Sequence, residues 1–233
     1  MQTILRCMSM VALLGLMAAC GVPSSTSTTS SGSGATTVVG SGKIVAEPRT
    51  VHDFNAVTVS GSSRVIITQG DQESLTISAD DNILPYLTSE VKDGRLTLGI
   101  KPNTSLRSTQ TVVYRLGVKA LKDLDLSGNT DVEAAKLTAD RLKVTHAGNG
   151  TTTIAGTVAH QEINLSGNTN FNGKNLVGKE AVVDAAGTGR AVVRISDKLD
   201  AHASGTTTIE YIGNPTVTKD EQGTGKVRQR SAG

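Results

Sequence analysis

The chain has 233 residues, which is enough for one large or two small domains with a buried core. Aromatic residues make up only 2% of the chain and Trp is missing, so neither an aromatic-lined pocket nor a base-stacking surface is expected. The formal net charge is +2 and the Lys and Arg residues are scattered, which argues against nucleic acid as a partner. The 25 glycines and the many Ser, Thr and Asn residues favour a β protein built from small side chains.

The N-terminus has the organisation of a bacterial lipoprotein signal. Arg6 precedes the apolar run Met8–Met17, which is shorter than the roughly twenty residues needed to cross a bilayer. Met17-Ala-Ala-Cys20 then resembles the lipobox, with Met where that motif usually has Leu. We therefore expect cleavage before Cys20, lipidation of Cys20 and loss of Cys7 with the signal. The alternative is a cytosolic helix with two ordinary apolar cysteines, which the Ser/Thr tract that follows disfavours.

Residues 1–19 are thus expected to be the signal peptide and residues 20–42 the acylated Cys and a flexible tether. The tether is nearly all Ser, Thr and Gly, and it has too little apolar surface to offset the entropy cost of ordering it. About twenty such residues span roughly 25 Å. Gly21 stands where Asp would be the inner-membrane retention signal, so the resemblance implies an extracytoplasmic, lipid-anchored protein of the outer membrane.

Residues 43–116 are predicted to form an irregular β-rich part of the domain. The expected strands are 57–59, 64–68, 74–78, 95–100 and 111–115. Val59-Ser-Gly-Ser-Ser-Arg-Val65 looks like one copy of a glycine-centred unit that recurs later. Asp80-Asp81-Asn82 precedes Ile83 and Leu84, and this order predicts the N-cap of a short helix or turn. Its oxygens could also bind Ca²⁺, although the chain lacks the Gly-Gly-x-Gly-x-Asp calcium repeat.

Residues 117–215 repeat with a period of about twenty. A glycine follows a short strand pattern in every copy, at Gly128, Gly148, Gly167, Gly187 and Gly205. A fixed period in this range predicts a solenoid. Apolar or small residues alternate with polar ones on both sides of each glycine, so every second side chain is expected to face a shared core.

Stacked repeats would place equivalent residues about 4.8 Å apart. Five positions before the glycine, Asp123, Lys143 and Glu162 would form a column of alternating charge, which hairpins would not require. Directly after the glycine stand Asn129, Asn149 and Asn168. Stacked amides can hydrogen-bond to the copies above and below, so these residues predict a structural ladder.

The expected fold is therefore all-β, a right-handed parallel β-helix-like solenoid with coils of about twenty residues, preceded by the irregular N-terminal part. The alternative is a β-sandwich of serial hairpins with Gly-Asn turns. Four of the five prolines precede residue 117 and the fifth, Pro215, is the last residue of the repeat region, so none interrupts a ladder of hydrogen bonds between copies. Residues 216–233 are expected to be a C-terminal tail.

Several segments resemble one family of bacterial envelope proteins. They are Arg49–Val57, Val65–Gly70, Leu75–Leu84, Val91–Leu98 and the Leu-Ser-Gly-Asn repeats. They resemble the putative auto-transporter adhesin, head GIN domain family, over about residues 44–228. The resemblance implies a β-helix-like fold and an extracytoplasmic lipoprotein, and it brings no catalytic residue.

One outward column is the best candidate for a ligand-facing strip. Three positions before each glycine stand Thr58, Asp125, Thr145, Asn164, Asp184 and His202. Asp184 and His202 would be one coil apart and could form an acid/base pair of a polysaccharide lyase or hydrolase. Asp125 would lie roughly 14 Å from Asp184, too far for paired carboxylates. An ordinary solvated face explains the same residues more simply.

Three other features are assigned to structure rather than to chemistry. His146 falls at an inward position without a second His or Cys in its column, which indicates a core histidine and not a metal ligand. Gly223-Thr-Gly-Lys226 lacks the Ser/Thr and the helix of a phosphate loop. The basic segment Lys226–Arg230 is too short to indicate nucleic acid.

The expected function is a non-enzymatic, lipid-anchored envelope protein that presents a polar face for binding or adhesion, with a polysaccharide or a surface protein as partner. No cofactor and no metal are expected. Two alternatives stay open: a polysaccharide lyase or hydrolase that uses the outward strip, and a structural component that associates with copies of itself.

Overall fold

The computed structural model describes residues 35–231. The expected signal peptide, Cys20 and most of the expected tether lie outside the described residues. The prediction of an all-β protein is confirmed, because the one helix in this range is the three-residue 3₁₀ helix η1 (Leu84–Tyr86). The strands are β1 (Thr36–Val39), β2 (Ile44–Arg49), β3 (Ala56–Gln69), β4 (Ser74–Asp80), β5 (Leu87–Lys92), β6 (Arg95–Ile100), β7 (Thr104–Arg107), β8 (Val112–Val118), β9 (Asp123–Ile212), β10 (Thr216–Glu221) and β11 (Lys226–Gln229).

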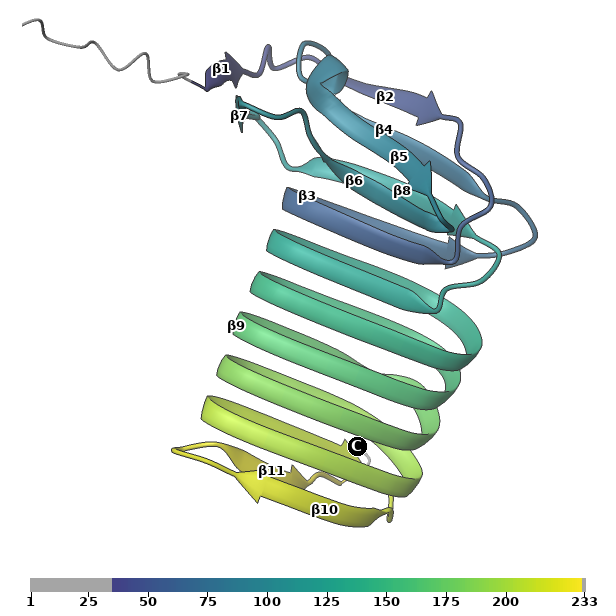
Figure 1. The fold of residues 1–233 in the computed structure, drawn as a ribbon, viewed down its shortest axis with the longest axis vertical. Helices are drawn as coiled ribbons and strands as arrows, with labels where there is room; N and C mark the ends of the chain where they lie inside the picture. The colour runs from purple at the N-terminus through teal and green to yellow at the C-terminus, as the bar shows by residue number, and fades with distance from the viewer. Residues whose placement is uncertain (1–34, 232–233) are drawn as a thin grey trace, which may run out of the picture. The chain divides into compact units, whose positions relative to one another are not determined.

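The long strand β9 winds back over itself in successive coils that lie side by side between β3 and β10 (Figure 1). At one end β3 pairs with β9 in parallel, with Gly61 opposite Gly128. At the other end β10 and β11 also pair with β9 in parallel, with Asp220 opposite His202. Neighbouring segments therefore run in the same direction, as stacked repeats require and as hairpin neighbours would not.

The repeat glycines lie directly over one another. A Cβ added at Gly148 would overlap the carbonyl oxygen of Gly128, and one added at Gly167 would overlap that of Gly148. Both glycines also have a positive φ, +129° and +86°. The same contact continues from Gly167 to Gly187 and on to Gly205. The sequence marker of the repeat is thus a position where close backbone approach and left-handed geometry both exclude a side chain.

The alternating side chains form a continuous core. The residues two and four positions before each glycine are all buried, from Leu124 and Leu126 in the first copy to Ala201 and Ala203 in the last. The residues four and six positions after each glycine are buried as well, except Tyr211, which is half-buried. This confirms the predicted period of two. Because these side chains project into the narrow interior that the coils enclose, small residues such as Ala185 suffice to fill it.

The N-terminal part continues the stack and then covers its end. Val59–Val65 lies within β3, so the predicted extra copy of the glycine-centred unit is confirmed. The other edge of β3 pairs in parallel with β6 and β8. Beyond them, β4 pairs antiparallel with β8, β2 antiparallel with β4, and β5 antiparallel with β6. The change from parallel to antiparallel pairing ends the repeat and covers an edge that would otherwise be free.

The short helix or turn predicted after Asp80–Asn82 is present, as a turn followed by η1, but the predicted side-chain cap is wrong. The N-cap of η1 is Ile83, and no side chain caps it. Asp80 is the last residue of β4 and accepts hydrogen bonds from the Gly42 and Thr109 amides at 2.7 and 3.0 Å. The three polar residues hold two neighbouring loops rather than a helix end. Sequence proximity to Leu84 was misleading because their partners are distant in the chain.

The ordered part extends past the expected boundaries at both ends. β1 lies inside residues 20–42, and it pairs in parallel with β7. β10 and β11 lie inside the expected tail and continue the stack after β9. Both segments are largely exposed, but each pairs in register with a strand of the domain. Within residues 35–231 no helix is long and apolar enough to cross a membrane.

Candidate functional site

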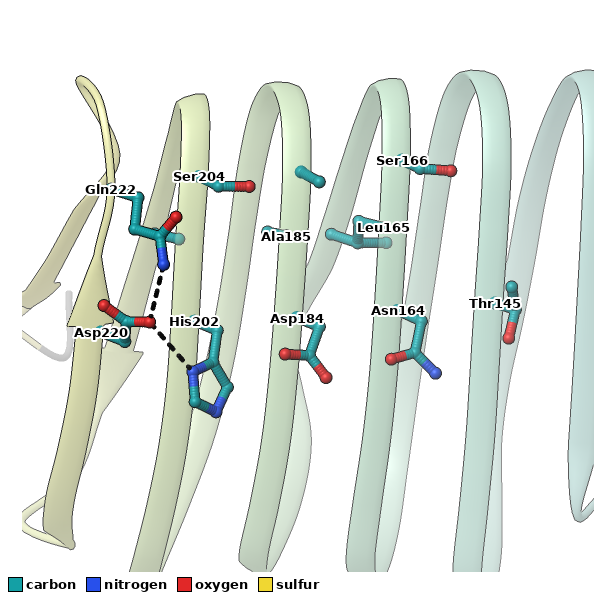
Figure 2. Close-up of a pocket in the computed structure, with 12 residues that line it drawn as sticks. Thr145, Asn164, Leu165, Ser166, Asp184, Ala185, His202, Ser204, Asp220 and Gln222 are labelled. Carbon is teal, nitrogen blue, oxygen red and sulfur yellow. Dashed lines mark hydrogen bonds and ion pairs between the residues drawn. The ribbon is translucent and has the colours of Figure 1, made fainter.

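The outward strip is a straight column with one residue from each coil. Thr58 lies opposite Asp125 in the β3–β9 register, and His202 lies opposite Asp220 in the β9–β10 register. Figure 2 shows four strip residues in line on successive coils, with Asp220 next to the last of them. The four are Thr145, Asn164, Asp184 and His202. Their side chains are half-buried, except that of Asp184, which is exposed.

A hollow of 310 Å³ lies along this column. The four strip residues line it, and Asp220 and Gln222 close it at the C-terminal end. The neighbouring outward position of each coil is small, with Ser166, Ala186 and Ser204 in consecutive coils, and this leaves the space open. Asp125 lies further along the column and is not part of the lining. The strip therefore forms a polar trough only over its C-terminal half.

His202 is held by carboxylates other than Asp184. Its Nε2 lies 3.3 Å from Asp200 Oδ1, and its Nδ1 lies 3.9 Å from Asp220 Oδ2. Gln222 Nε2 donates to Asp220 Oδ2 at 3.1 Å (Figure 2). Among residues 35–231 there is no hydrogen bond or ion pair between Asp184 and His202. The imidazole thus joins a polar network at the C-terminal end of the trough.

The column of alternating charge is present. Lys143 Nζ lies 2.6 Å from Glu162 Oε1, and Arg95 pairs with Asp123 at the N-terminal side. The hydrogen bond to Glu162 raises the pKa of Lys143, and the reciprocal bond lowers the pKa of Glu162. These exposed pairs contribute little to stability individually. They align the outward faces of adjacent coils.

The asparagine column makes one direct amide contact. Asn149 Nδ2 donates to Asn129 Oδ1 at 2.8 Å, and Asn129 Nδ2 lies 3.5 Å from Ser62 Oγ on β3. In the part of the chain that the structure describes, Asn168 makes no side-chain hydrogen bond to Asn149. The amide column therefore links the first coils of the stack.

The remaining polar candidates have structural surroundings. His146 is fully buried, and its Nδ1 lies 3.0 Å from Thr152 Oγ1. Gly223–Lys226 connects two strands, β10 and β11. The Asp80 and Asp81 carboxylates accept hydrogen bonds from Thr109 and Ser41. No group of three or more His, Cys, Asp or Glu residues suited to a metal ion occurs within residues 35–231.

A second hollow, of 400 Å³, was not predicted from the sequence. It lies beside the trough and surrounds Val182, and Asp184 lines both hollows. The sequence carries a signal for it, because Val182 stands where neighbouring repeats have Glu162 and Asp200. That break in the charged column can be interpreted only once the register between coils is known.

One protein family matches most of the described residues. The family described as "Putative auto-transporter adhesin, head GIN domain" matches residues 53–215. The chain belongs to this family. The matched range contains β3, all of β9 and every lining residue of the two hollows except Asp220 and Gln222, so the family match covers the repeat and most of its N-terminal cover.

Solved structures show the same fold at low sequence identity. A putative adhesin from Bacteroides fragilis is 22% identical, with a TM-score of 0.68 over 83% of this chain and 100% of that one. A putative lipid binding protein from Parabacteroides distasonis is 20% identical, with a TM-score of 0.54 over 83% and 99%. A putative adhesin from Parabacteroides merdae is 21% identical, with a TM-score of 0.52 over 84% and 100%. Among curated proteins, none matches the chain.

Proposed function

We propose that this head GIN domain protein is a lipid-anchored component of the cell envelope whose β-solenoid presents a polar face for binding or adhesion, without catalysis. The observation that carries the proposal is the 310 Å³ trough, which equivalent positions of consecutive coils build. Parallel pairing of β9 with β3, β10 and β11 supports a right-handed solenoid rather than a sandwich. Membership of a family described as adhesin-like supports a surface role.

A stacked scaffold suits recognition by many weak contacts. Its side chains are fixed on paired backbone, so a ligand that lies along the strip orders few groups when it binds. The trough offers hydroxyl, amide, carboxylate and imidazole groups from Thr145, Asn164, Asp184 and His202. Such a set can both donate and accept hydrogen bonds. A polysaccharide or a polar protein surface is the partner that this chemistry favours.

Attachment is proposed through Cys20, with the chain between Cys20 and β1 as the tether. A Gly/Ser-rich linker of about fifteen residues has a root-mean-square span of roughly 20 Å, which is enough to hold the domain away from an outer-membrane surface. Metabolic labelling with an alkyne fatty acid tests this step. We expect label in the natural chain and none in Cys20→Ala. Equal labelling of both chains would contradict lipidation at this residue.

Binding and catalysis can be separated in a single assay. The full chain with Cys20→Ala, which prevents acylation, is incubated with a panel of cell-wall and capsular polysaccharides, and retained protein and new chain ends are both measured. Retention without new ends, weakened by Asn164→Ala and unchanged by Asn129→Ala outside the trough, would support the proposal. New chain ends that disappear in Asp184→Ala would instead identify a lyase or hydrolase.

Self-association through the ends of the solenoid is the remaining alternative. Sedimentation of the same chain over a range of concentrations tests it directly. A monomer at all concentrations would contradict it. The exposed, charged side chains of β10, which include Lys219 and Asp220, disfavour pairing along that edge.

A further inference from the structure

Val182 is one of the few large apolar side chains on the outer surface, with 41% of its area exposed. It lies five positions before Gly187, in the column of alternating charge. Along its own strand the next outward residues are Glu180 and Asp184. In the adjacent coils the same column holds Glu162 and Asp200, because the repeat glycines are stacked in register. All four outward neighbours of Val182 are therefore carboxylates.

These residues enclose the 400 Å³ hollow. The four carboxylates line it together with Val182, and the cationic residues at its edge are Arg141 and Lys198, with His160 beside them. The lining thus holds two more carboxylates than permanent cations. An exposed valine within an acidic ring distinguishes this hollow from the trough, which has polar strip residues but also Leu165, Ala185 and Ala203 in its lining.

The carboxylates differ in how far they are already satisfied. Glu162 is 2.6 Å from Lys143, and Glu180 Oε2 is 3.1 Å from His160 Nδ1. Asp200 Oδ1 lies 3.3 Å from His202 Nε2, but it has no hydrogen-bond partner among the described residues. Asp184 makes no ion pair within residues 35–231. Its charge is therefore available to a ligand that occupies the hollow.

A buried acceptor lines the same hollow. Gln161 is only 4% exposed, and its Oε1 has no hydrogen-bond partner in the part of the chain that the structure describes. Its Nε2 reaches the Val158 carbonyl at a long 3.4 Å. A buried carbonyl oxygen without a donor is unfavourable. The Gln161 amide lies on the core side of the wall, near Gly178 and Ile195, so it marks a weakly satisfied wall of the hollow and is not itself a contact for a ligand.

We propose that the Val182 hollow binds a primary ammonium group carried on a short alkyl chain. An ammonium is a compact cation with three donors and no acceptor, which matches a site whose nearest polar groups are acceptors. The methylenes beside it would cover Val182, since apolar stems of charged side chains commonly lie on such patches. Either a free polyamine or the side chain of a lysine could supply this group. The inference adds a chemistry next to the strip and does not depend on what the strip binds.

The test follows the Val182 methyl groups by NMR in the full chain with Cys20→Ala, during titration with 1,5-diaminopentane. We expect saturable chemical-shift changes of the Val182 methyl groups. Added salt should weaken the binding, because the charges are exposed. The uncharged 1,5-pentanediol should give no saturable shift. N-acetyl-lysine amide distinguishes the sources: shifts with both amines indicate a site open to lysine side chains, and shifts with the diamine alone indicate a free polyamine.

Matched variants separate this site from general surface charge. Asp184→Asn should weaken diamine binding about three- to tenfold, whereas Asp140→Asn, an exposed carboxylate outside the hollow, should not. Val182→Ser should weaken it as well, whereas Val177→Ser, at an exposed valine outside the hollow, should not.

No saturable shift at Val182, equal shifts with pentanediol, or unchanged binding in Asp184→Asn would overturn the inference. A chain that binds the diamine but no envelope polymer would leave it standing and remove the proposed function. Retention on a polymer without diamine binding would do the reverse.

Discussion

Replacement of one repeat glycine measures how closely the coils stack. Gly167 has φ of +86°, and a Cβ there would overlap the Gly148 carbonyl oxygen of the preceding coil. Gly42 has nearly the same φ, +85°, but a Cβ there would have no atom within 4 Å. Gly42→Ala is therefore a matched control, because it carries the backbone cost without the contact between coils.

The two costs can be estimated separately. A left-handed conformation costs an L-residue about 1–2 kcal/mol. Forcing a methyl group into a packed site costs about 1–3 kcal/mol more, because neighbouring backbone must move. We expect Gly42→Ala to lower the free energy of unfolding by about 1–2 kcal/mol, and Gly167→Ala by about 2–5 kcal/mol. The change in unfolded-chain entropy is the same for both and cancels in the comparison.

Urea unfolding followed by far-ultraviolet circular dichroism provides the measurement, with the midpoint compared at equal slope. A lower slope in one variant would indicate that the repeats no longer unfold together. If the two variants differ by less than about 0.5 kcal/mol, which is ordinary for surface changes, the stacking argument is refuted. Serial hairpins would give that result, because Gly167 would then lie in an isolated turn without Gly148 above it.

Three further outcomes follow from the polar contacts. Glu210 is buried and accepts hydrogen bonds from Arg228 Nη2 and Nε at 2.6 and 3.1 Å. Glu210→Gln should therefore lower the free energy of unfolding in urea by about 1.5–3 kcal/mol. The same change at the exposed Glu133 should lower it by less than about 1 kcal/mol. Equal losses at the two sites would contradict this account of the last coil. The pKa of Asp80 is lowered, chiefly by the hydrogen bond from the Thr109 hydroxyl. Asp80→Asn should speed hydrogen exchange of the Gly42 and Thr109 amides, which donate to this carboxylate. Unchanged exchange would contradict the role of Asp80 in holding the two loops together. Burial lowers the pKa of His146, so the folded chain keeps a neutral imidazole while the unfolded chain takes up a proton below about pH 6.5. The free energy of unfolding should therefore fall as the pH drops below about 6.5, by at most about 1.4 kcal/mol per pH unit. His146→Leu, which matches Leu126 and Leu165 of neighbouring coils, should remove this part of the pH dependence. The same pH dependence in the variant would contradict the explanation.

Two opposing effects determine the pKa of Glu210. Desolvation acts to raise the pKa, but the hydrogen bonds from Arg228 and the charges of Arg190 and Arg230 together hold it below its usual value. The carboxylate therefore remains charged in the folded chain at neutral pH. It fixes β11 to the last coil of β9 by two arginines, at 2.6 and 3.2 Å. The basic segment Lys226–Arg230 thus has an internal partner, which agrees with its assignment to structure.

The repeat was predictable because every copy solves the same packing problem. Each coil lies between two equivalent coils, so its inward positions and its glycine meet the same constraints, and the pattern appears directly in the sequence. Gly61 could be recognised in β3 for that reason. The N-terminal cover has no such repetition. The strands β2, β5 and β7 were not predicted from the sequence. Each pairs with a single partner strand, and their own residues do not indicate which strand that is.

The hydrogen bonds of Asp80 show the same limit at the level of one residue. A short polar run before apolar residues is typical of a helix N-cap, and local reasoning stops there. In the structure the partners of Asp80 are 38 and 29 residues away. The chain reverses into antiparallel pairing at this end, which brings loops together that the period of the repeat does not relate.

The two hollows follow from one property of stacked coils. Inward positions are constrained by the coil above and the coil below, but an outward residue can change without disturbing the stack. Val182 illustrates this freedom, since it replaces a charge in its column while the backbone register continues to Asp200 and beyond. Where a binding function has shaped such a surface, its trace should be a local departure from the column pattern rather than a motif along the chain. The trough arises from a run of small residues beside the strip, and the acidic ring from one apolar residue among charges. Both lie in the coils between Arg141 and Gln222, so the C-terminal half of the repeat is where variants should be made first.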